Sequence, residues 1–181
     1  MSILEGNGQE WVELLFLFFF EGVGKVINIE IPGRGMLLLE YLVLDFNGTI
    51  AQDGKLLPGV KEKINSLSQS LETYILTADT FGKCREECLG INAQLKVLDR
   101  ASGTSEKEDF IVSLGAKTVV TVGNGSNDCM MLAKSALGIG VIGNEGASMK
   151  ALSQADVVVK DIHDALDLLI KPQRLVATLR E

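Results

Sequence analysis

The segment Tyr41-Leu-Val-Leu-Asp-Phe-Asn-Gly-Thr49 decides the predicted fold of this chain. It begins with four hydrophobic residues, which is typical of a strand buried on both faces of a parallel sheet. The run ends in Asp45, and a tight turn containing Gly48 and Thr49 follows it. Because sites in open α/β sheets lie at the carboxyl ends of the strands, Asp45 occupies the position of a functional residue.

Predicted strands and helices alternate through the rest of the chain. Residues 26–31 and 36–39 flank a Pro-Gly turn and predict an N-terminal β-hairpin, whereas 54–59 is predicted to be loop. The alternation predicts an α/β fold, a doubly wound, Rossmann-like parallel sheet of about six strands flanked by helices. The further strands are predicted at 73–77, 95–98, 118–122, 138–142 and 156–159, and the helices at 58–69, 81–89, 105–114, 128–136, 147–153, 162–170 and 172–179.

Residues 1–25 differ in composition from the rest of the chain. Residues 11–20 read WVELLFLFFF, ten residues that include Glu13. This is too short for a membrane-spanning helix, which needs about 20 apolar residues, and it lacks the basic start and cleavage site of a signal peptide. We interpret 1–25 as an atypical apolar extension, namely a docking helix, a partner-binding element or a start-site artefact, and 26–181 as a single domain.

Composition excludes several classes of function. A chain of 181 residues with 46% hydrophobic residues suits one domain with a full core. The net charge of −7 argues against nucleic acid or an anionic membrane as a partner. The odd count of cysteines and the lack of a leader predict a reducing, cytoplasmic compartment. Cys84 and Cys88 are expected to share a helix face against the sheet, and the only histidine, His163, is expected at the surface.

Four separated signals occur in order along the chain. They are Asp-Phe-Asn-Gly-Thr at 45–49, Thr77, Lys107 and Gly-Asn-Gly-Ser-Asn-Asp at 123–128. Their order and spacing resemble the haloacid dehalogenase superfamily, whose first motif is D-x-[DT]-G-T and whose fourth motif in P-type ATPases is G-D-G-x-N-D. The resemblance covers residues 41–160. Within the superfamily, the sequence is most similar to small soluble P-type-ATPase-like proteins, whose first motif also reads D-x-N-G-T.

The resemblance implies a role for each signal. Asp45 would attack phosphorus and form an aspartyl-phosphate, which splits one difficult step into two. Thr77 would donate its hydroxyl to a phosphoryl oxygen, and Lys107 would offset negative charge. Lys117 is a rival to Lys107 but fits the spacing less well. The implied catalytic residues are Asp45, Asn47, Thr49, Thr77 and Lys107, and the implied phosphate-binding residues are Gly48, Thr77, Lys107 and Asn127.

Magnesium is the implied cofactor, since it takes oxygen ligands and keeps several waters. In the family the nucleophile, the backbone carbonyl two residues later and a motif-four Asp hold the ion. These positions are here Asp45, the Asn47 carbonyl and Asn124. Asp128 would lie beside these ligands, and it would either bind the ion directly or hydrogen-bond a group that does. Asn127 would form a hydrogen bond with the loop or with the phosphate.

Two residues depart from the family pattern. Asn47 replaces the Asp that protonates the leaving group and activates water in the family's phosphatases, and Asn124 replaces the first Asp of G-D-G-x-N-D. An amide cannot exchange a proton at neutral pH, and general acid–base catalysis contributes roughly 10²–10⁴-fold. We therefore expect slow turnover and weaker magnesium binding.

The spacing leaves no room for a cap domain. Only 27 residues separate Thr49 from Thr77, and only seven separate Asp99 from Lys107. Without a membrane span the chain is not expected to be an ion pump. Its open site must accept a large substrate, use a neighbour in a homo-oligomer as a lid, or be slow.

The predicted function is a slow magnesium-dependent phosphatase for an unidentified phosphorylated substrate. One alternative is a non-catalytic module of the same fold that binds phosphoryl groups or a partner. Another is an accessory domain of a separately encoded partner.

Overall fold

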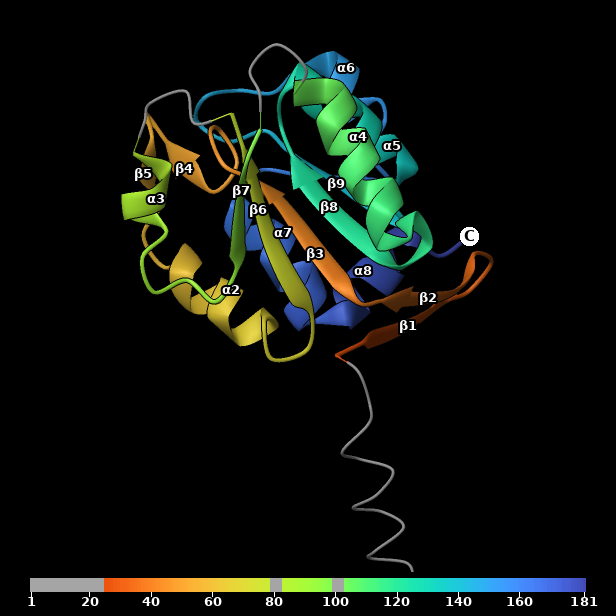
Figure 1. Cartoon of the computed structure of the whole chain (residues 1–181). Coiled ribbons are helices and arrows are strands. Elements are labelled where there is room, and N and C mark those ends of the chain that lie inside the picture. Colours follow the sequence, from red (N-terminus) through yellow and green to blue (C-terminus); the bar gives the residue numbers. More distant parts are fainter. Residues whose placement is uncertain (1–24, 79–82, 99–102) are drawn as a thin grey trace, which may run out of the picture.

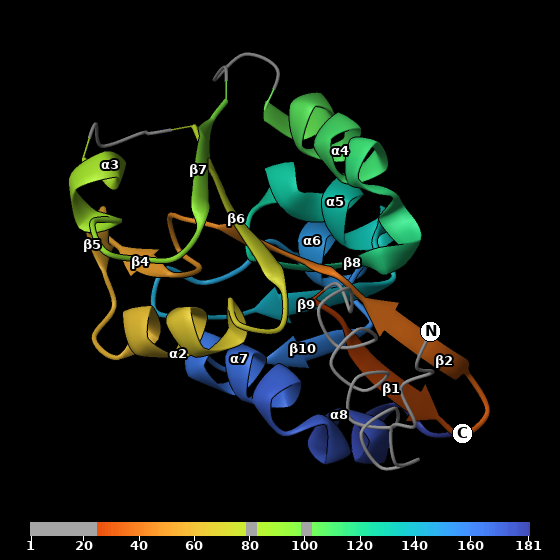
Figure 2. The same ribbon diagram turned by 60° about the horizontal axis from the view of Figure 1, so that its bottom comes forward.

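The computed structural model describes residues 25–78, 83–98 and 103–181. Its centre is a six-stranded parallel sheet in the order β10-β9-β8-β3-β6-β7. Figure 1 labels β3 and β6 to β9, and Figure 2 labels β10. The predicted α/β class and sheet are thus confirmed, and the strand that ends in Asp45 lies in the middle of the sheet. The strands are β3 (Tyr41–Asp45), β6 (Glu72–Thr77), β7 (Gln94–Val97), β8 (Val119–Gly123), β9 (Leu137–Val141) and β10 (Val157–Val159).

Helices cover both faces of the sheet, as a doubly wound fold requires (Figure 2). The larger core cluster lies on the side of α2 (Val60–Leu67), α7 (Ile162–Ile170) and α8 (Pro172–Leu179). The smaller cluster lies on the side of α4 (Gly103–Leu114) and α5 (Cys129–Lys134). Two single-turn helices, α3 (Cys84–Glu87) and α6 (Met149–Leu152), complete the described helices.

The predicted N-terminal hairpin is confirmed. Strands β1 (Ile27–Ile31) and β2 (Gly35–Leu39) pair in antiparallel fashion, and Ile29, Ile31 and Leu39 enter the large core cluster. The alternation of buried and exposed residues along β1 is the pattern from which the strand was predicted.

A second, small hairpin was missed. Strands β4 (Ala51–Gln52) and β5 (Lys55–Leu56) pair around Asp53-Gly54, where both residues have positive φ, 52° and 75°. Asp-Gly is the preferred pair for such a two-residue turn. The prediction of loop from residue 54 was wrong for Lys55–Leu56, because two-residue strands are too short to leave a period in the sequence.

Several predicted helices are shorter in the structure. The helix predicted at 81–89 is reduced to Cys84–Glu87, and residues 79–82 lie outside the described part. The helix predicted at 128–136 is preceded by a 3-10 turn, η2 (Ser126–Asp128), and ends at Lys134. The extension at 1–24 also lies outside the described residues. Among the residues that are described, no helix is long and apolar enough to cross a membrane.

Candidate active site

A buried lysine joins two carboxylates at the carboxyl edge of the sheet. Lys107 Nζ lies 2.5 Å from Asp45 Oδ1 and 2.6 Å from Asp128 Oδ1. The residues are 1%, 7% and 0% exposed, respectively. Charged side chains are almost never buried to this extent unless they are paired. Three separate elements, β3, α4 and η2, therefore converge on one ion-pair cluster.

The strand pattern explains why Asp45 meets Lys107. Side chains alternate along a strand, so Val43 and Asp45 point to the same face of β3. Val43 packs in the cluster that contains Ile111 of α4, and Lys107 is one turn earlier on that helix. The rival Lys117 is exposed and lies before β8, at the opposite end of the parallel strands. The structure thus brings Lys107, and not Lys117, to Asp45.

Asp128 organises the loop that follows β8. Its Oδ2 accepts hydrogen bonds from the backbone N–H groups of Asn124, at 3.0 Å, and Gly125, at 2.8 Å. A Cβ on Gly123 would come within 2.7 Å of the Asp128 carboxylate, so only glycine fits there. Because both Asp128 oxygens are already bonded, Asp128 is better placed to hold Lys107 and the loop than to contact a metal directly.

Three side-chain oxygen atoms, from Thr49, Asp45 and Asn124, lie around the hydroxyl proton of Thr49. Thr49 Oγ1 lies 3.1 Å from Asp45 Oδ2 and 3.1 Å from Asn124 Oδ1. The orientation of the amide is fixed, because Asn124 Nδ2 lies 3.0 Å from the carbonyl oxygen of Gly146, which can only accept a hydrogen bond. The Thr49 hydroxyl can donate to only one of its two neighbours, so an acceptor remains without a proton.

This excess of acceptor oxygens suits a hard cation. Magnesium prefers carboxylate and carbonyl oxygens and keeps waters in its remaining positions. Among the described residues, no cluster of three or more His, Cys, Asp or Glu side chains could hold a metal by itself. A cation here would therefore depend on the amide oxygen of Asn124 beside the carboxylate of Asp45.

The turn after β3 packs directly against Asn124. Gly48 has a φ of 78°, and a Cβ at this position would overlap the Asn124 side chain. The side-chain oxygen of Asn47 is buried and has no hydrogen-bond donor among the described residues. An unsatisfied buried acceptor costs about 1–3 kcal/mol. Asn47 is thus not held in place by its amide oxygen, in contrast to Asn124.

Two other predicted residues differ in burial. Asp45 pairs with Leu76 in the register of β3 and β6, so Thr77 lies one residue further along the same edge, and it is buried. Asn127 is exposed, and its side chain makes no hydrogen bond with another described residue. Of its two predicted partners, the loop lies close by, because a Cβ on Gly125 would come within 2.5 Å of Asn127 Oδ1, and the bond to phosphate stays a prediction.

Burial and the neighbouring charges both shift the pKa values of Asp45 and Lys107. Burial raises the pKa of Asp45, and the Asp128 carboxylate raises it further, to about 6, although Lys107 and Thr49 favour the ionised form. Burial by itself lowers the pKa of Lys107, but the two carboxylates outweigh it and raise that pKa overall. A second positive charge beside Asp45 would favour its ionised form.

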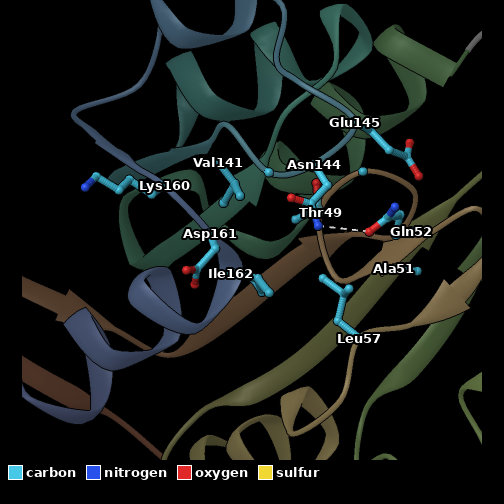
Figure 3. Close-up of a pocket in the computed structure, with 12 residues that line it drawn as sticks. Thr49, Ala51, Gln52, Leu57, Val141, Asn144, Glu145, Lys160, Asp161 and Ile162 are labelled. Atoms are coloured by element: carbon cyan, nitrogen blue, oxygen red, sulfur yellow. Dashed lines mark hydrogen bonds between the residues drawn. The ribbon is translucent and has the colours of Figure 1, made fainter.

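A pocket adjoins the turn at Gly48–Thr49 (Figure 3). Its empty volume is about 430 Å³, including the open mouth, and it lies between the β4–β5 hairpin and the loops after β9 and β10. Asn144 Nδ2 donates to Gln52 Oε1 at 3.0 Å, and the backbone N–H of Asp53 donates to Glu145 Oε1 at 2.7 Å. The loop after β9 is thereby fastened to the hairpin, a contact that no pattern in the sequence indicated.

Solved structures share this fold. A putative HAD superfamily (subfamily III A) hydrolase from Legionella pneumophila matches with a TM-score of 0.59 and 12% identity, over 94% of this chain and 96% of that chain. A 3-deoxy-D-manno-octulosonate 8-phosphate phosphatase from Moraxella catarrhalis, in complex with magnesium, phosphate and KDO, matches with a TM-score of 0.61 and 12% identity, over 78% and 94% of the chains. The chain has the haloacid dehalogenase (HAD) superfamily fold. The HAD resemblance inferred from the sequence is thus confirmed at the level of the fold, and residues 25–78, 83–98 and 103–181 include no cap domain.

Sequence comparisons find an uncharacterised relative and a phosphatase. No protein-family model matches the chain. An uncharacterised protein of Methanocaldococcus jannaschii is 52% identical over 65 residues, which cover 36% of this chain and 70% of that protein. The soluble P-type ATPase-like phosphatase of the same organism is 27% identical over 152 residues, which cover 81% of this chain and 55% of that protein. The chain thus spans about half the length of a homologous phosphatase.

Proposed function

We propose that this HAD-fold protein is a magnesium-dependent phosphohydrolase that works through an aspartyl-phosphate on Asp45. The observation that carries the proposal is Lys107, buried between Asp45 and Asp128 at the carboxyl edge of the sheet. Two carboxylates held around one lysine are costly to bury, and such perturbed groups concentrate at functional sites. Homology to a phosphatase supports the same reading.

In the first half-reaction, a carboxylate oxygen of Asp45 forms a bond to phosphorus, and the bond from phosphorus to the leaving-group oxygen breaks. Lys107 stays charged because the two carboxylates raise its pKa, and it offsets the charge of the incoming phosphate. Thr77, which ends the neighbouring strand β6, is the residue proposed to donate its hydroxyl to a phosphoryl oxygen. Asn47 cannot protonate the leaving group, so activated phosphates should react best.

In the second half-reaction, water must lose a proton while it attacks the phosphorus of the aspartyl-phosphate. The bond from phosphorus to Asp45 then breaks, which releases inorganic phosphate. A carboxylate at position 47 would accept that proton, but the amide of Asn47 cannot. The missing general base corresponds to roughly 10²–10⁴-fold in rate. The phosphorylated enzyme should therefore accumulate.

Asp45 and Asn124, with the backbone carbonyl of Asn47, are the residues that would hold magnesium. The three oxygens around the Thr49 proton support this assignment. Bound magnesium would neutralise charge on the phosphoryl oxygens. Asp128 would act from outside the ligand set, because its oxygens are bonded to Lys107 and to the backbone of the loop.

The substrate is proposed to be a phosphorylated compound that does not need a closing cap. Only the β4–β5 hairpin and α2 lie between Thr49 and β6. A large substrate, or a neighbouring copy of the chain, would have to shield the site from water.

A second candidate function is a non-catalytic module that binds phosphoryl groups. The observation in its favour is that the amides of Asn47 and Asn124 stand where the family has carboxylates. Such a module would bind phosphate through Lys107 without covalent chemistry at Asp45.

Labelling with acetyl phosphate distinguishes the two functions. The wild-type protein, with magnesium, should gain one phosphoryl group by intact mass, and a chase without donor should show its slow loss. Asp45→Asn and omission of magnesium should each abolish the label. If wild type binds phosphate but never labels with any activated donor, the binding module is the correct function.

A further inference from the structure

Two cysteine thiols touch beside the β4–β5 hairpin. Cys84 begins α3 and Cys88 follows the helix directly, and their Sγ atoms lie 3.8 Å apart. Cys84 is only 1% exposed within the large core cluster, whereas Cys88 is half-buried and can be reached from solvent. The third cysteine, Cys129, is buried on α5, in a different part of the fold.

A disulfide between the two thiols requires a shift of the backbone at one end of α3. Residues four apart in an α-helix have Cα atoms about 6.2 Å apart, from the helical rise and turn, within the roughly 4.4–6.8 Å that disulfides span. Their Cβ atoms, however, lie about 5–6 Å apart, beyond the roughly 3.5–4.5 Å of an unstrained disulfide. The sulfurs would need to approach by about 1.8 Å to reach bonding distance. Cys88 has a φ of −82° and a ψ of 3°, outside the regular helix, so rotation at this residue can supply the movement.

The reactivity of the pair is asymmetric. The hydrogen bond from the Cys84 thiol lowers the pKa of Cys88, although burial and Glu87 act against it. The thiolate is the nucleophile in disulfide exchange. Cys88 is thus both the more accessible sulfur and the one prepared to attack first, with Cys84 behind it as the resolving thiol.

We propose that Cys84 and Cys88 form a redox-active dithiol, which a small-molecule disulfide oxidises to a disulfide that spans α3. The Cys88 thiolate attacks one sulfur of that disulfide, and the other sulfur leaves as a thiolate. Cys84 then loses its proton to solvent and attacks Cys88 Sγ, which expels the second small thiol. Two protein thiols are oxidised, and one small disulfide is reduced to two thiols.

The oxidation would be transmitted to the hairpin that follows the Thr49 turn. Glu87 Oε2, on α3, accepts a hydrogen bond from the backbone N–H of Leu56 at 2.9 Å, and α3 lies against β5 (Figure 1). Closing the disulfide across the single turn of α3 must move Glu87 relative to Leu56. Because strained disulfides are easily reduced, the modification should be reversible. The movement of Glu87 should weaken its hydrogen bond to Leu56 of β5.

Oxidised glutathione is the probe that tests the modification. Wild type should lose two hydrogen atoms in mass and retain no glutathione, and dithiothreitol should reverse the change. Cys88→Ser should form no disulfide, whereas Cys84→Ala should keep one glutathione on Cys88. Cys129→Ala is the matched control and should behave as wild type. Phenylarsine oxide, which bridges two nearby thiols with loss of water, should bind wild type but not Cys88→Ser.

Hydrogen exchange of the Leu56 amide tests the coupling. It should accelerate about tenfold on oxidation, the factor that corresponds to 1.4 kcal/mol, and Glu87→Gln in the reduced protein should move it in the same direction. The dithiol is wrong if wild type keeps glutathione on Cys88, or stays reduced while its urea-unfolded form oxidises. The coupling is wrong if a disulfide forms and the Leu56 amide exchanges at an unchanged rate.

Discussion

The two sides of the site differ in what they retain. The carboxylate side (Asp45, Lys107 and Asp128) has each charged group paired within 2.6 Å. The amide side (Asn47, Thr49 and Asn124) has amides where the family's phosphatases have carboxylates, and no donor in the described part of the chain reaches the side-chain oxygen of Asn47. In the proposed mechanism, the first side would supply the nucleophile and the charge for phosphoryl transfer to Asp45. The second side would bind the metal ion and activate water, with amides in place of carboxylates.

This difference separates the two half-reactions. In the proposed mechanism, attack by Asp45 requires an ionised carboxylate and a neutralising charge, which Lys107 would provide. Hydrolysis of the aspartyl-phosphate requires a base, and the amide side has none. We therefore expect substitutions on the carboxylate side to abolish labelling, and substitutions on the amide side to change the lifetime of the label or its dependence on metal.

The largest effect is expected from Lys107→Met. It leaves Asp45 and Asp128 buried without a cation, and breaking a buried ion pair costs about 3–5 kcal/mol. Urea unfolding should show this loss, and labelling by acetyl phosphate should disappear. Lys117→Met, at an exposed lysine of the same chain, should change stability by less than about 0.5 kcal/mol. A stable Lys107→Met protein that still labels would contradict the role of the cluster.

Asn47→Asp should have the next largest effect, on the lifetime of the phosphorylated enzyme. The new carboxylate can accept the proton of the attacking water, so dephosphorylation should accelerate by roughly 10²-fold and at most 10⁴-fold. The measurement is a pulse-chase of acid-stable phosphate at saturating magnesium, with Asp45→Asn in the same background as the blank.

Two outcomes would change the roles assigned to the carboxylate side and the amide side. If wild type never labels while Asn47→Asp turns over, the chain retains the scaffold of a lost activity. If neither protein labels with any activated donor, the carboxylate side binds phosphate without reacting.

The carboxylate side was largely predictable from sequence, and the contacts of the amide side were not. A hydrophobic run that ends in Asp45 predicts a buried central strand with a site at its end, and family spacing selected Lys107 over Lys117. The bond from Asn124 to the Gly146 carbonyl joins two loops that no periodicity relates. The partner of Asn124 is a backbone carbonyl, which any residue type at position 146 would supply, so the sequence gives no sign of this contact.

Thr49→Val tests the shared proton on the amide side. The substitution removes the hydroxyl that lies between Asp45 Oδ2 and Asn124 Oδ1. Two acceptors are then left without this donor, at a cost of about 1–3 kcal/mol. Thermal melts should show this loss without magnesium and a smaller one with it, because a cation would attract both acceptor oxygens in place of the missing hydrogen-bond donor. Thr118→Val, which removes a hydroxyl bonded to the Gly115 carbonyl, should show no dependence on magnesium. Equal losses with and without magnesium would exclude a cation between these oxygens.

Asn124→Asp should have the smallest net effect, because two contributions oppose each other. A carboxylate adds a negative, hard ligand beside Asp45, which favours magnesium. However, the second oxygen would replace Nδ2 opposite the Gly146 carbonyl, where the present distance is 3.0 Å, and two acceptors at that separation repel. We expect magnesium affinity to rise by no more than about tenfold, or 1.4 kcal/mol, and the metal-free protein to lose about 1 kcal/mol of stability.

Calorimetric titration measures the magnesium affinity of Asn124→Asp, and thermal melts measure its stability. The matched control is Asn144→Asp, because the amide of Asn144 bonds the side-chain carbonyl of Gln52 at the surface. Unchanged or weaker affinity would mean that Asn124 does not face the ion, and an undiminished metal-free stability would mean that the Gly146 contact does not select the amide.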